Sequence, residues 1–357
     1  MSDIISRVKE QLRYVAKYAN DENKKTGFII GNTAKCSIVQ PYSVPLRNTS
    51  LMVTGGVIVY SERDAVEIAK LVDGKVDYVL VDAEKKIADA DSRTGEPGNI
   101  ERAVREHVQF SKLWTFKGND LSVEAVDALL TKLYNSCERG LGGKKIAIIG
   151  CGNLGSKLAL KLVERGANVF ITRRDQYKLT QLESALNIIK PIYTTSQVVA
   201  CQDNEQACKG VDIVIGASQG TPVISAKMIK LLSPNAIVVD VGKGSICNDA
   251  ISMAHAYQIS VYRLDISCAI AGVIAKLIMM DELFEKSMGR KEYNGYYLVS
   301  GGVMGKRGDI VVNSISQPTE IYGVADGVGD FLKQDNKLTI MDLDTENLRK
   351  EEVEMSI

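Results

Sequence analysis

The chain has 357 residues, more than twice a typical domain length, so we expect at least two domains. Its 44 basic side chains are balanced by 44 acidic ones, which argues against a protein that binds nucleic-acid phosphates through a basic face. The seven cysteines include no CxxC pair, the first twenty residues carry charges where an export signal is apolar, and residues 268–280 are too short to span a membrane. We therefore expect a cytoplasmic protein with reduced thiols and no metal site.

The first 140 residues predict a small α/β domain. Short apolar runs alternate with helical patterns at crossover lengths that favour partly parallel strands. The expected elements are helices over 1–26, 62–71, 100–108 and 121–138, and strands over 27–30, 57–60 and 76–82. The long helix ends at Gly140–Gly143, a segment suited to an interdomain hinge.

The second half alternates regularly between strand and helix. We expect strands over 144–150, 167–174, 191–195, 212–218, 236–242 and 259–265, separated by helices over 153–165, 176–187, 205–209, 225–232 and 248–257. This alternation is typical of a doubly wound parallel Rossmann sheet. A helix over 269–287, a glycine-rich stretch over 293–329 and an acidic tail follow. The predicted fold is thus α/β, with an N-terminal substrate and catalytic domain (1–140), a Rossmann NADP-binding domain (141–266) and a C-terminal region (267–357).

The strongest motif is the run Gly150-Cys151-Gly152-Asn153-Leu154-Gly155, a GxGxxG between a predicted strand and a predicted helix. The first glycine permits a tight turn, the second lets backbone approach a pyrophosphate, and the third lets the helix pack against the strand. The phosphates then meet the N-terminus of the helix near Asn153 and Leu154. We predict dinucleotide binding here and assign Cys151 no redox role.

The end of the second predicted strand selects the dinucleotide. An NAD site usually places an acidic residue there, whereas this chain reads Thr172-Arg173-Arg174-Asp175. Two guanidiniums and a hydroxyl can bind a 2′-phosphate, so NADP is favoured. Asp175 keeps NAD open as an alternative.

Two further loops follow strands at the edge where parallel sheets bind ligands. Ser218 and Gly220 follow the fourth strand of this half, and Gly242 follows the fifth. Small residues there let a nicotinamide lie against the backbone, so we expect these three to line its half of the site.

On these motifs the chain resembles the aminoacid-dehydrogenase-like Rossmann proteins, which include shikimate dehydrogenase, glutamyl-tRNA reductase and methylenetetrahydrofolate dehydrogenase. Residues 169–174 resemble the arginine turn that reads NADP in shikimate dehydrogenases, and residues 210–242 are similar to a stretch of methylenetetrahydrofolate dehydrogenases. No single member is matched. The resemblance implies a catalytic domain before the Rossmann domain and a C-terminal helix that returns toward it.

Shikimate dehydrogenases use a lysine after an N-terminal strand and an aspartate at the start of the interdomain helix. In this chain the resemblance implies Lys86, or its neighbour Lys85, paired with Asp120 or Asn119 as a proton relay. The alternative is that Asn119 or Asp120 caps the helix at 121 and that the lysines belong to a polar loop. With only two histidines in the chain, a histidine-based relay is disfavoured.

We therefore predict an NADP-dependent dehydrogenase or reductase that passes hydride to or from a small polar metabolite in an interdomain cleft. The alternatives are a one-carbon (pterin) carrier dehydrogenase and a non-catalytic NADP(H)-binding sensor. The run 300–309, with Lys306 and Arg307, is either a substrate loop or a hairpin turn with solvated charges. The expected partners are a small-molecule substrate and a second copy of the chain in a homo-oligomer (a dimer), with neither nucleic acid nor membrane.

Overall fold

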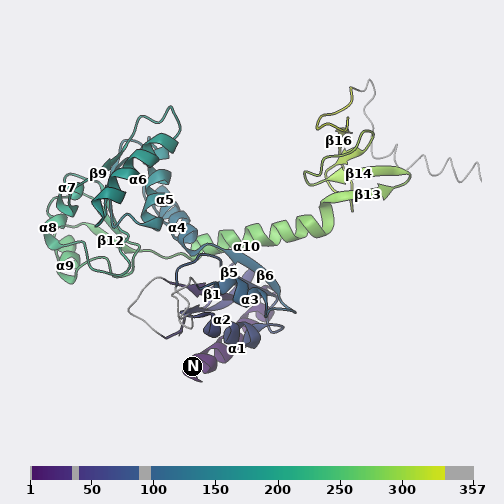
Figure 1. The fold of residues 1–357 in the computed structure, drawn as a ribbon, viewed down its shortest axis with the longest axis horizontal. Coiled ribbons are helices and arrows are strands. Elements are labelled where there is room, and N and C mark those ends of the chain that lie inside the picture. Colours follow the sequence, from purple (N-terminus) through teal and green to yellow (C-terminus); the bar gives the residue numbers. More distant parts are fainter. Residues whose placement is uncertain (1, 34–39, 88–97, 334–357) are drawn as a thin grey trace, which may run out of the picture. The chain divides into compact units, whose positions relative to one another are not determined.

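The structure is a computed structural model that describes residues 2–33, 40–87 and 98–333 (Figure 1). The chain forms two compact units, residues 1–273 and 274–357. The predicted acidic tail lies outside the described residues. Within the described ranges, no helix is long and apolar enough to cross a membrane.

The first sheet belongs to the N-terminal part of the first unit. Its elements are α1 (Ser2–Asp21), β1 (Lys25–Asn32), β2 (Tyr42–Ser43), β3 (Arg47–Asn48), β4 (Met52–Val59), α2 (Glu62–Val72), β5 (Tyr78–Asp82), α3 (Ile100–Arg105) and β6 (Lys112–Phe116). The strands lie in the order β2-β4-β1-β5-β6, with β3 paired to β4. Because β1, β4, β5 and β6 are parallel, their carboxyl ends meet at one edge, which the residues Asn32, Asp82 and Phe116 mark.

One face of this sheet is covered by α1, α2 and α3. Val8 and Val15, seven residues apart on α1, are fully buried against alternate strand residues such as Phe28 and Ile30. The apolar residues that recur at helical spacing in the sequence of α1 are therefore the ones that the helix buries against the sheet. The sequence missed β6, whose residues are only partly buried and do not alternate.

The second sheet has the topology predicted from the sequence. Its elements follow α4 (Gly118–Leu133) as β7 (Lys145–Ile149), α5 (Asn153–Glu164), β8 (Asn168–Thr172), α6 (Gln176–Ile189), β9 (Val198–Ala200), α7 (Asn204–Cys208), β10 (Ile213–Gly216), α8 (Ala226–Ile229), β11 (Ile237–Asp240), α9 (Asn248–Ala256) and β12 (Ser260–Arg263). The strands lie in the order β12-β11-β10-β7-β8-β9 and are all parallel. From β7 the chain adds β8 and β9 on one side of the sheet, and it then returns to add β10, β11 and β12 on the other side. That reversal is the switch point of a Rossmann fold, so the predicted fold class is confirmed.

Helices cover both faces of this sheet. Ile146 and Ile148 of β7 pack with α4, α5 and α6, whereas Ala147 and Ile149 pack with α7, α8 and α9. Burial on both faces explains why these strands read as unbroken apolar runs in the sequence.

The strand predicted at 191–195 is wrong. Thr194 N donates to Pro191 O at 2.9 Å, which closes a turn, and the Ile192 and Tyr193 side chains are 90% and 94% exposed. The strand is instead β9, where buried Val198 pairs with Val169 of β8.

The second unit carries a small sheet of its own. The boundary between the units falls within α10 (Ser267–Glu282), which is followed by a π-helical turn (Leu283–Ser287). The strands are β13 (Gly289–Tyr293), β14 (Tyr296–Ser300), β15 (Ile310–Val312) and β16 (Ile321–Val324). They lie in the sheet in the same order as in the chain. Strands β14 and β15 are parallel, so the run 300–309 is not a hairpin turn. The buried Asp309 at its end accepts two hydrogen bonds, at 2.8 and 2.9 Å, from Arg290.

Candidate functional site

The GxGxxG turn has the geometry that each glycine was predicted to provide. Gly150 has φ = 89°, and a Cβ there would lie 3.0 Å from Ser218 N. A Cβ on Gly152 would meet nothing within 4 Å, which leaves open space above the turn. A Cβ on Gly155 would lie 3.3 Å from Ile148 of β7, so this position sets how closely α5 packs on the sheet. The turn thus leaves room at the position where a pyrophosphate is expected.

The N-terminus of α5 is open for a phosphate. Its cap, Gly152, offers no side-chain hydrogen bond, and Asn153 and Leu154 form the first helical turn. The first backbone N–H groups of a helix have no intrahelical partner and attract anions. Cys151 is fully buried, and burial raises the pKa of its thiol to about 12, so the thiol stays protonated at neutral pH.

The end of β8 places two arginines beside the turn. Arg173 Nη1 lies 3.5 Å from Cys151 O, and Arg174 is exposed. Thr172 is buried, 4% exposed, and its carbonyl accepts from Cys151 N at 2.7 Å. Asp175 caps α6 by accepting from the backbone N–H of Lys178 at 3.0 Å. That hydrogen bond, with the charges of Lys178 and Arg173, lowers the pKa of Asp175.

The loops after β10 and β11 are in direct contact. A Cβ on Gly242 would lie only 1.8 Å from Ser218 O, and Gly220 N donates to Ser218 O at 2.6 Å. Ser245 Oγ also donates to Ser218 O, at 3.3 Å, and the buried Asp240 accepts from Ser245 N at 3.1 Å. The structure therefore brings together the three residues expected around the nicotinamide, Ser218, Gly220 and Gly242.

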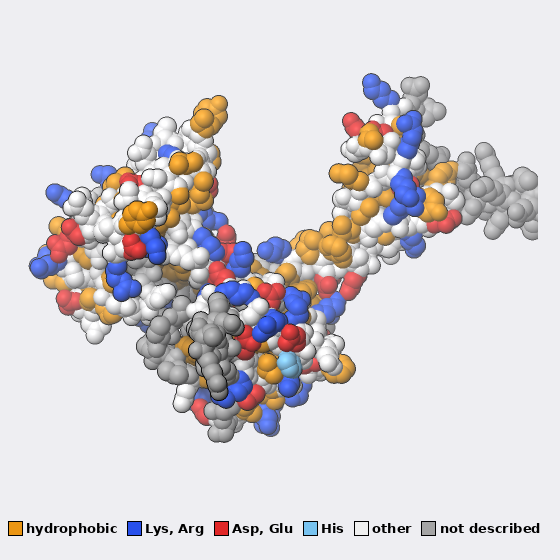
Figure 2. All heavy atoms as spheres, in the orientation of Figure 1, with side chains coloured by type: hydrophobic (Ala, Val, Ile, Leu, Met, Phe, Trp, Pro, Cys, Tyr) orange, Lys and Arg blue, Asp and Glu red, His pale blue; other side chains and the backbone are white. Residues whose placement is uncertain are grey.

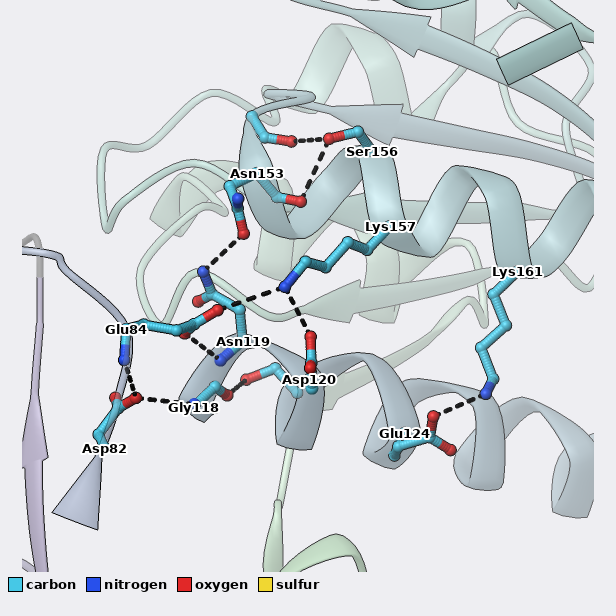
Figure 3. Close-up of polar contacts among 12 residues, drawn as sticks. Asp82, Glu84, Gly118, Asn119, Asp120, Glu124, Asn153, Ser156, Lys157 and Lys161 are labelled. Atoms are coloured by element: carbon cyan, nitrogen blue, oxygen red, sulfur yellow. Dashed lines mark hydrogen bonds and ion pairs between the residues drawn. The ribbon is translucent and has the colours of Figure 1, made fainter. Parts of the chain in front are cut away.

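A partly buried ion cluster, formed by Lys86, Asp82 and Glu84, lies at the carboxyl edge of the first sheet, and Figure 3 shows its two carboxylates facing the first turn of α4. Lys86 Nζ lies 2.6 Å from Asp82 Oδ2 and 2.9 Å from Glu84 Oε2. The side chains of Lys86, Asp82 and Glu84 are 13%, 2% and 13% exposed. Both carboxylates also accept backbone N–H groups from the first turn of α4, Asp82 from Gly118 at 3.1 Å and Glu84 from Asn119 at 2.8 Å. An ammonium is thus fixed between two anions that are themselves anchored to a helix end.

The predicted pair between Lys86 and Asp120 is replaced by a different arrangement. Asp120 Oδ1 instead accepts from Lys157 Nζ of α5 at 2.6 Å, because Asp120 lies on the side of α4 that packs on α5. Asn119 Nδ2 donates to Asn153 Oδ1 at 3.0 Å, and the helix cap expected from Asn119 or Asp120 comes from Asp82 and Glu84. Lys85 Nζ donates to Asn99 Oδ1, so Lys86 is the lysine of the buried cluster.

Four residues of this network were not singled out from the sequence: Asp82, Glu84, Gly118 and Lys157. A Cβ on Gly118 would lie 2.6 Å from Lys86 Nζ and 2.7 Å from Asp82 Oδ2, so a glycine is what lets the helix end approach the ion pair. The available signals were the position of Asp82 at a strand end and the i, i+4 spacing of Asn153 and Lys157.

Two further polar atoms at the same sheet edge are buried without a partner. Asn32, at the end of β1, is 6% exposed; its Nδ2 donates to Glu84 O at 3.0 Å, whereas its Oδ1 finds no hydrogen-bond partner in the described part of the chain. The hydroxyl of Tyr60, just after β4, is also unpartnered among the described residues, and burial and the neighbouring Tyr42 raise its pKa to about 12. Unsatisfied buried groups are costly and often mark a ligand site.

The sequence of the second sheet matches a known family. Residues 145–244 match the family described as NADP oxidoreductase coenzyme F420-dependent. Over this segment the chain is similar to NADP oxidoreductase domains. The match covers the GxGxxG turn, the arginine turn and the loops after β10 and β11. The chain is thus an NAD(P)-dependent oxidoreductase with a Rossmann domain, as the sequence predicts.

Solved structures with related folds are distant. Dipicolinate synthase A chain from Bacillus subtilis is 12% identical, with a TM-score of 0.36 over 73% of this chain and 97% of that one. L-tryptophan dehydrogenase from Nostoc punctiforme is 12% identical, with a TM-score of 0.39 over 70% and 72%. An N-acetyl-L-ornithine transcarbamylase is 11% identical, with a TM-score of 0.41 over 78% and 96%. Nothing about the substrate follows from likenesses of this size. No curated protein sequence matches the chain.

Proposed function

We propose that the chain is an NADP-dependent dehydrogenase or reductase in which Lys86 is the proton donor to a small polar metabolite. The observation that carries this proposal is the partly buried ammonium of Lys86, held between Asp82 and Glu84 at the carboxyl edge of the first sheet, where parallel sheets bind ligands. Asn119 and Asn153 join this edge to the first turn of α5, where we place the dinucleotide. The acid group and the cofactor turn are therefore connected through Glu84 and Asn119.

The residues around the GxGxxG turn fit NADP. The open space at Gly152 and the uncapped N-terminus of α5 would hold the pyrophosphate, and Ser218, Gly220 and Gly242 would line the nicotinamide. Bound there, the dinucleotide supplies or accepts the hydride.

Proton transfer is the step that the chain's own residues perform. When a carbonyl carbon of the substrate receives hydride, its oxygen gains a negative charge and takes a proton from Lys86 Nζ. Asp82 and Glu84 hold the ammonium in place. Burial raises the pKa of Glu84, but hydrogen bonds from Lys86, Asn119 N and Lys157 lower it by more, so the pKa of Glu84 lies below its ordinary value and this carboxylate stays ionised. Lys86 regains its proton from solvent. In the oxidative direction neutral Lys86 accepts the hydroxyl proton.

The choice of NADP over NAD rests on the arginine turn. Asp175 caps α6 with its carboxylate, so it is less available to a ribose hydroxyl, whereas Arg173 Nη1 lies 3.5 Å from Cys151 O of the turn and Arg174 is exposed. We expect Arg174→Ala to weaken NADPH binding at least tenfold while changing NADH binding less than twofold, measured by nicotinamide fluorescence. Equal losses for both dinucleotides would argue against a 2′-phosphate site.

The substrate is expected to carry a hydrogen-bond donor. The amide of Asn32 is oriented by its donation to Glu84 O, and its Oδ1, which no described residue contacts by a hydrogen bond, presents an acceptor next to the Lys86 cluster. A hydroxyl or amino group on the substrate would satisfy it. Tyr60, protonated because of its raised pKa, adds a hydroxyl at the same edge.

The test compares two neighbouring lysines. Carbonyl acids, imines and pterins are screened for NADPH oxidation, and the best substrate is then assayed with Lys86→Met and with Lys85→Met as the matched control. General acid catalysis typically contributes 10²–10⁴-fold, so Lys86→Met should lose about that factor in kcat at saturating NADPH, and Lys85→Met should remain active. Equal activity of both variants would remove Lys86 from the mechanism. If NADPH binds but no compound is turned over, the sensor alternative gains, and turnover of pterins alone favours the one-carbon carrier.

A further inference from the structure

We infer that Lys157 and Glu84 are positioning residues that couple occupancy of the dinucleotide turn to the placement of the Lys86 ammonium. This inference rests on the proposed function, because it takes the dinucleotide to bind at the N-terminus of α5. Neither side chain needs to touch the dinucleotide or the substrate for this coupling. The link is a continuous chain of charges from α5 to the edge of the first sheet.

Lys157 begins this chain on the helix that follows the GxGxxG turn. It lies four residues after Asn153 and therefore on the same face of α5. Its Nζ lies 2.6 Å from Asp120 Oδ1 and 3.3 Å from Glu84 Oε1 (Figure 3). A displacement of the first turns of α5 is thus transmitted to the Glu84 carboxylate.

Glu84 passes the displacement on to Lys86. Its Oε1 faces Lys157, while its Oε2 accepts from Asn119 N at 2.8 Å and lies 2.9 Å from Lys86 Nζ. Both oxygen atoms of this carboxylate are therefore in hydrogen bonds or ion pairs, and the side chain is 13% exposed. Charge-assisted hydrogen bonds in such a shielded place have defined geometry, so Glu84 cannot follow α5 without moving Lys86.

A second contact runs beside the charged one. Asn119 donates its backbone N–H to Glu84 Oε2, and its side-chain Nδ2 donates to Asn153 Oδ1 at 3.0 Å. The first turn of α4 is therefore connected to both the anion cluster and the first residue of α5. Phosphate binding at α5 should consequently restrict the whole cluster, and by linkage a restricted cluster should bind the dinucleotide more tightly.

The chain provides a matched control one turn further along α5. Lys161 Nζ lies 2.8 Å from Glu124 Oε1 and 3.8 Å from Asp127 Oδ2, both on α4, and its side chain is 30% exposed against 35% for Lys157. Lys161 thus makes the same kind of contact between the same two helices, but it does not reach Glu84. Figure 3 shows the two lysines side by side on the helix.

The experiment measures amide hydrogen exchange of residues 82–86 in the full chain, with and without saturating NADP⁺. In the wild type and in Lys161→Met, NADP⁺ should slow exchange at these residues by about fivefold or more, the lower end of ordinary coupling between sites. In Lys157→Met the slowing should be smaller than in the wild type, because only the Asn119–Asn153 contact remains, although NADP⁺ still binds; Lys157→Arg should restore it. If Lys157→Met is unfolded by circular dichroism, Lys157→Gln takes its place.

Three results would overturn the inference. The first is equal slowing in the wild type and Lys157→Met, and the second is equal loss in Lys157→Met and Lys161→Met, which would indicate a merely structural contact. The third is NADP⁺ binding to the wild type without any slowing at 82–86. Failure of the wild type to bind NADP⁺ at all is a different observation, made by fluorescence or calorimetric titration, and it would refute the proposed function itself.

Discussion

Replacing Gly118 by alanine tests the geometry of the Lys86 cluster directly. The added methyl group would lie 2.6 Å from Lys86 Nζ and 2.7 Å from Asp82 Oδ2, whereas favourable carbon contacts are about 3.5 Å or longer. The helix end or the ion pair must therefore move by about 1 Å. Because the Asp82 and Lys86 side chains are 2% and 13% exposed, the displaced groups cannot simply turn to solvent.

The expected cost follows from two opposing effects. Weakening a buried charge-assisted hydrogen bond costs about 1.5–3 kcal/mol, and alanine is a better helix former than glycine by up to about 1 kcal/mol. Gly118→Ala should thus lower the free energy of unfolding by about 1–2 kcal/mol, measured by urea denaturation. A 1 Å misplacement of the proton donor should also reduce kcat by roughly tenfold to a hundredfold.

Gly272 provides the control for this substitution. It lies within α10, and a Cβ there would meet nothing within 4 Å. Gly272→Ala should therefore stabilise the protein by up to about 1 kcal/mol through helix propensity alone. If Gly118→Ala were as stable and as active as Gly272→Ala, the close approach of α4 to the ion pair would not be what fixes Lys86, and the reasoning would be refuted.

Other predictions concern the dinucleotide turn, the thiols and the second unit. Gly150→Ala should destabilise the fold by about 1–3 kcal/mol and abolish NADPH binding, since φ = 89° disfavours any side chain; fluorescence titration and urea unfolding would check this. At pH 8, thiol reagents should modify the exposed Cys137 but leave Cys151 intact in the native protein, because burial raises the pKa of Cys151 to about 12; peptide mass spectrometry would show which thiol reacts. The hydrogen bonds from Arg290 lower the pKa of Asp309, so their contribution to stability is present above the ordinary carboxyl pKa of 3.8 and is lost as pH falls through the lowered value; Asp309→Asn should destabilise the second unit at pH 7 and much less in strong acid.

The Rossmann half was predictable because its local signals agree with one another. Buried parallel strands read as apolar runs, and the close surroundings of Gly150 and Gly155 give a steric reason for a glycine at each of these two positions of the GxGxxG turn. The exception is the strand expected at 191–195, where apolar Ile192 and Tyr193 lie in a turn with their side chains exposed.

The Lys86 cluster was only partly predictable because its partners come from distant segments. Lys86 and Asn119 were singled out, but ion pairing depends on which faces of α4 and α5 meet, and no local pattern states that. Lys157 reads in the sequence as an ordinary helical lysine, and its role follows only from its contact with Glu84.

A net charge of zero does not indicate where charged side chains cluster in the fold. On the face drawn in Figure 2, Lys and Arg side chains are interspersed with Asp and Glu. The informative charges are instead those shielded from solvent, on Lys86, Asp82 and Glu84, and the net charge of the chain does not reveal them. Composition therefore bounds the class of partner but does not find the site.

The most direct test of the account is a crystal structure of the full chain with NADP⁺ bound. The account predicts the pyrophosphate on the backbone N–H groups of Asn153 and Leu154, the 2′-phosphate beside Arg173 and Arg174, and the nicotinamide facing the Lys86 cluster with room for a substrate between them. A dinucleotide bound elsewhere, or a nicotinamide ring turned away from Lys86, would contradict it.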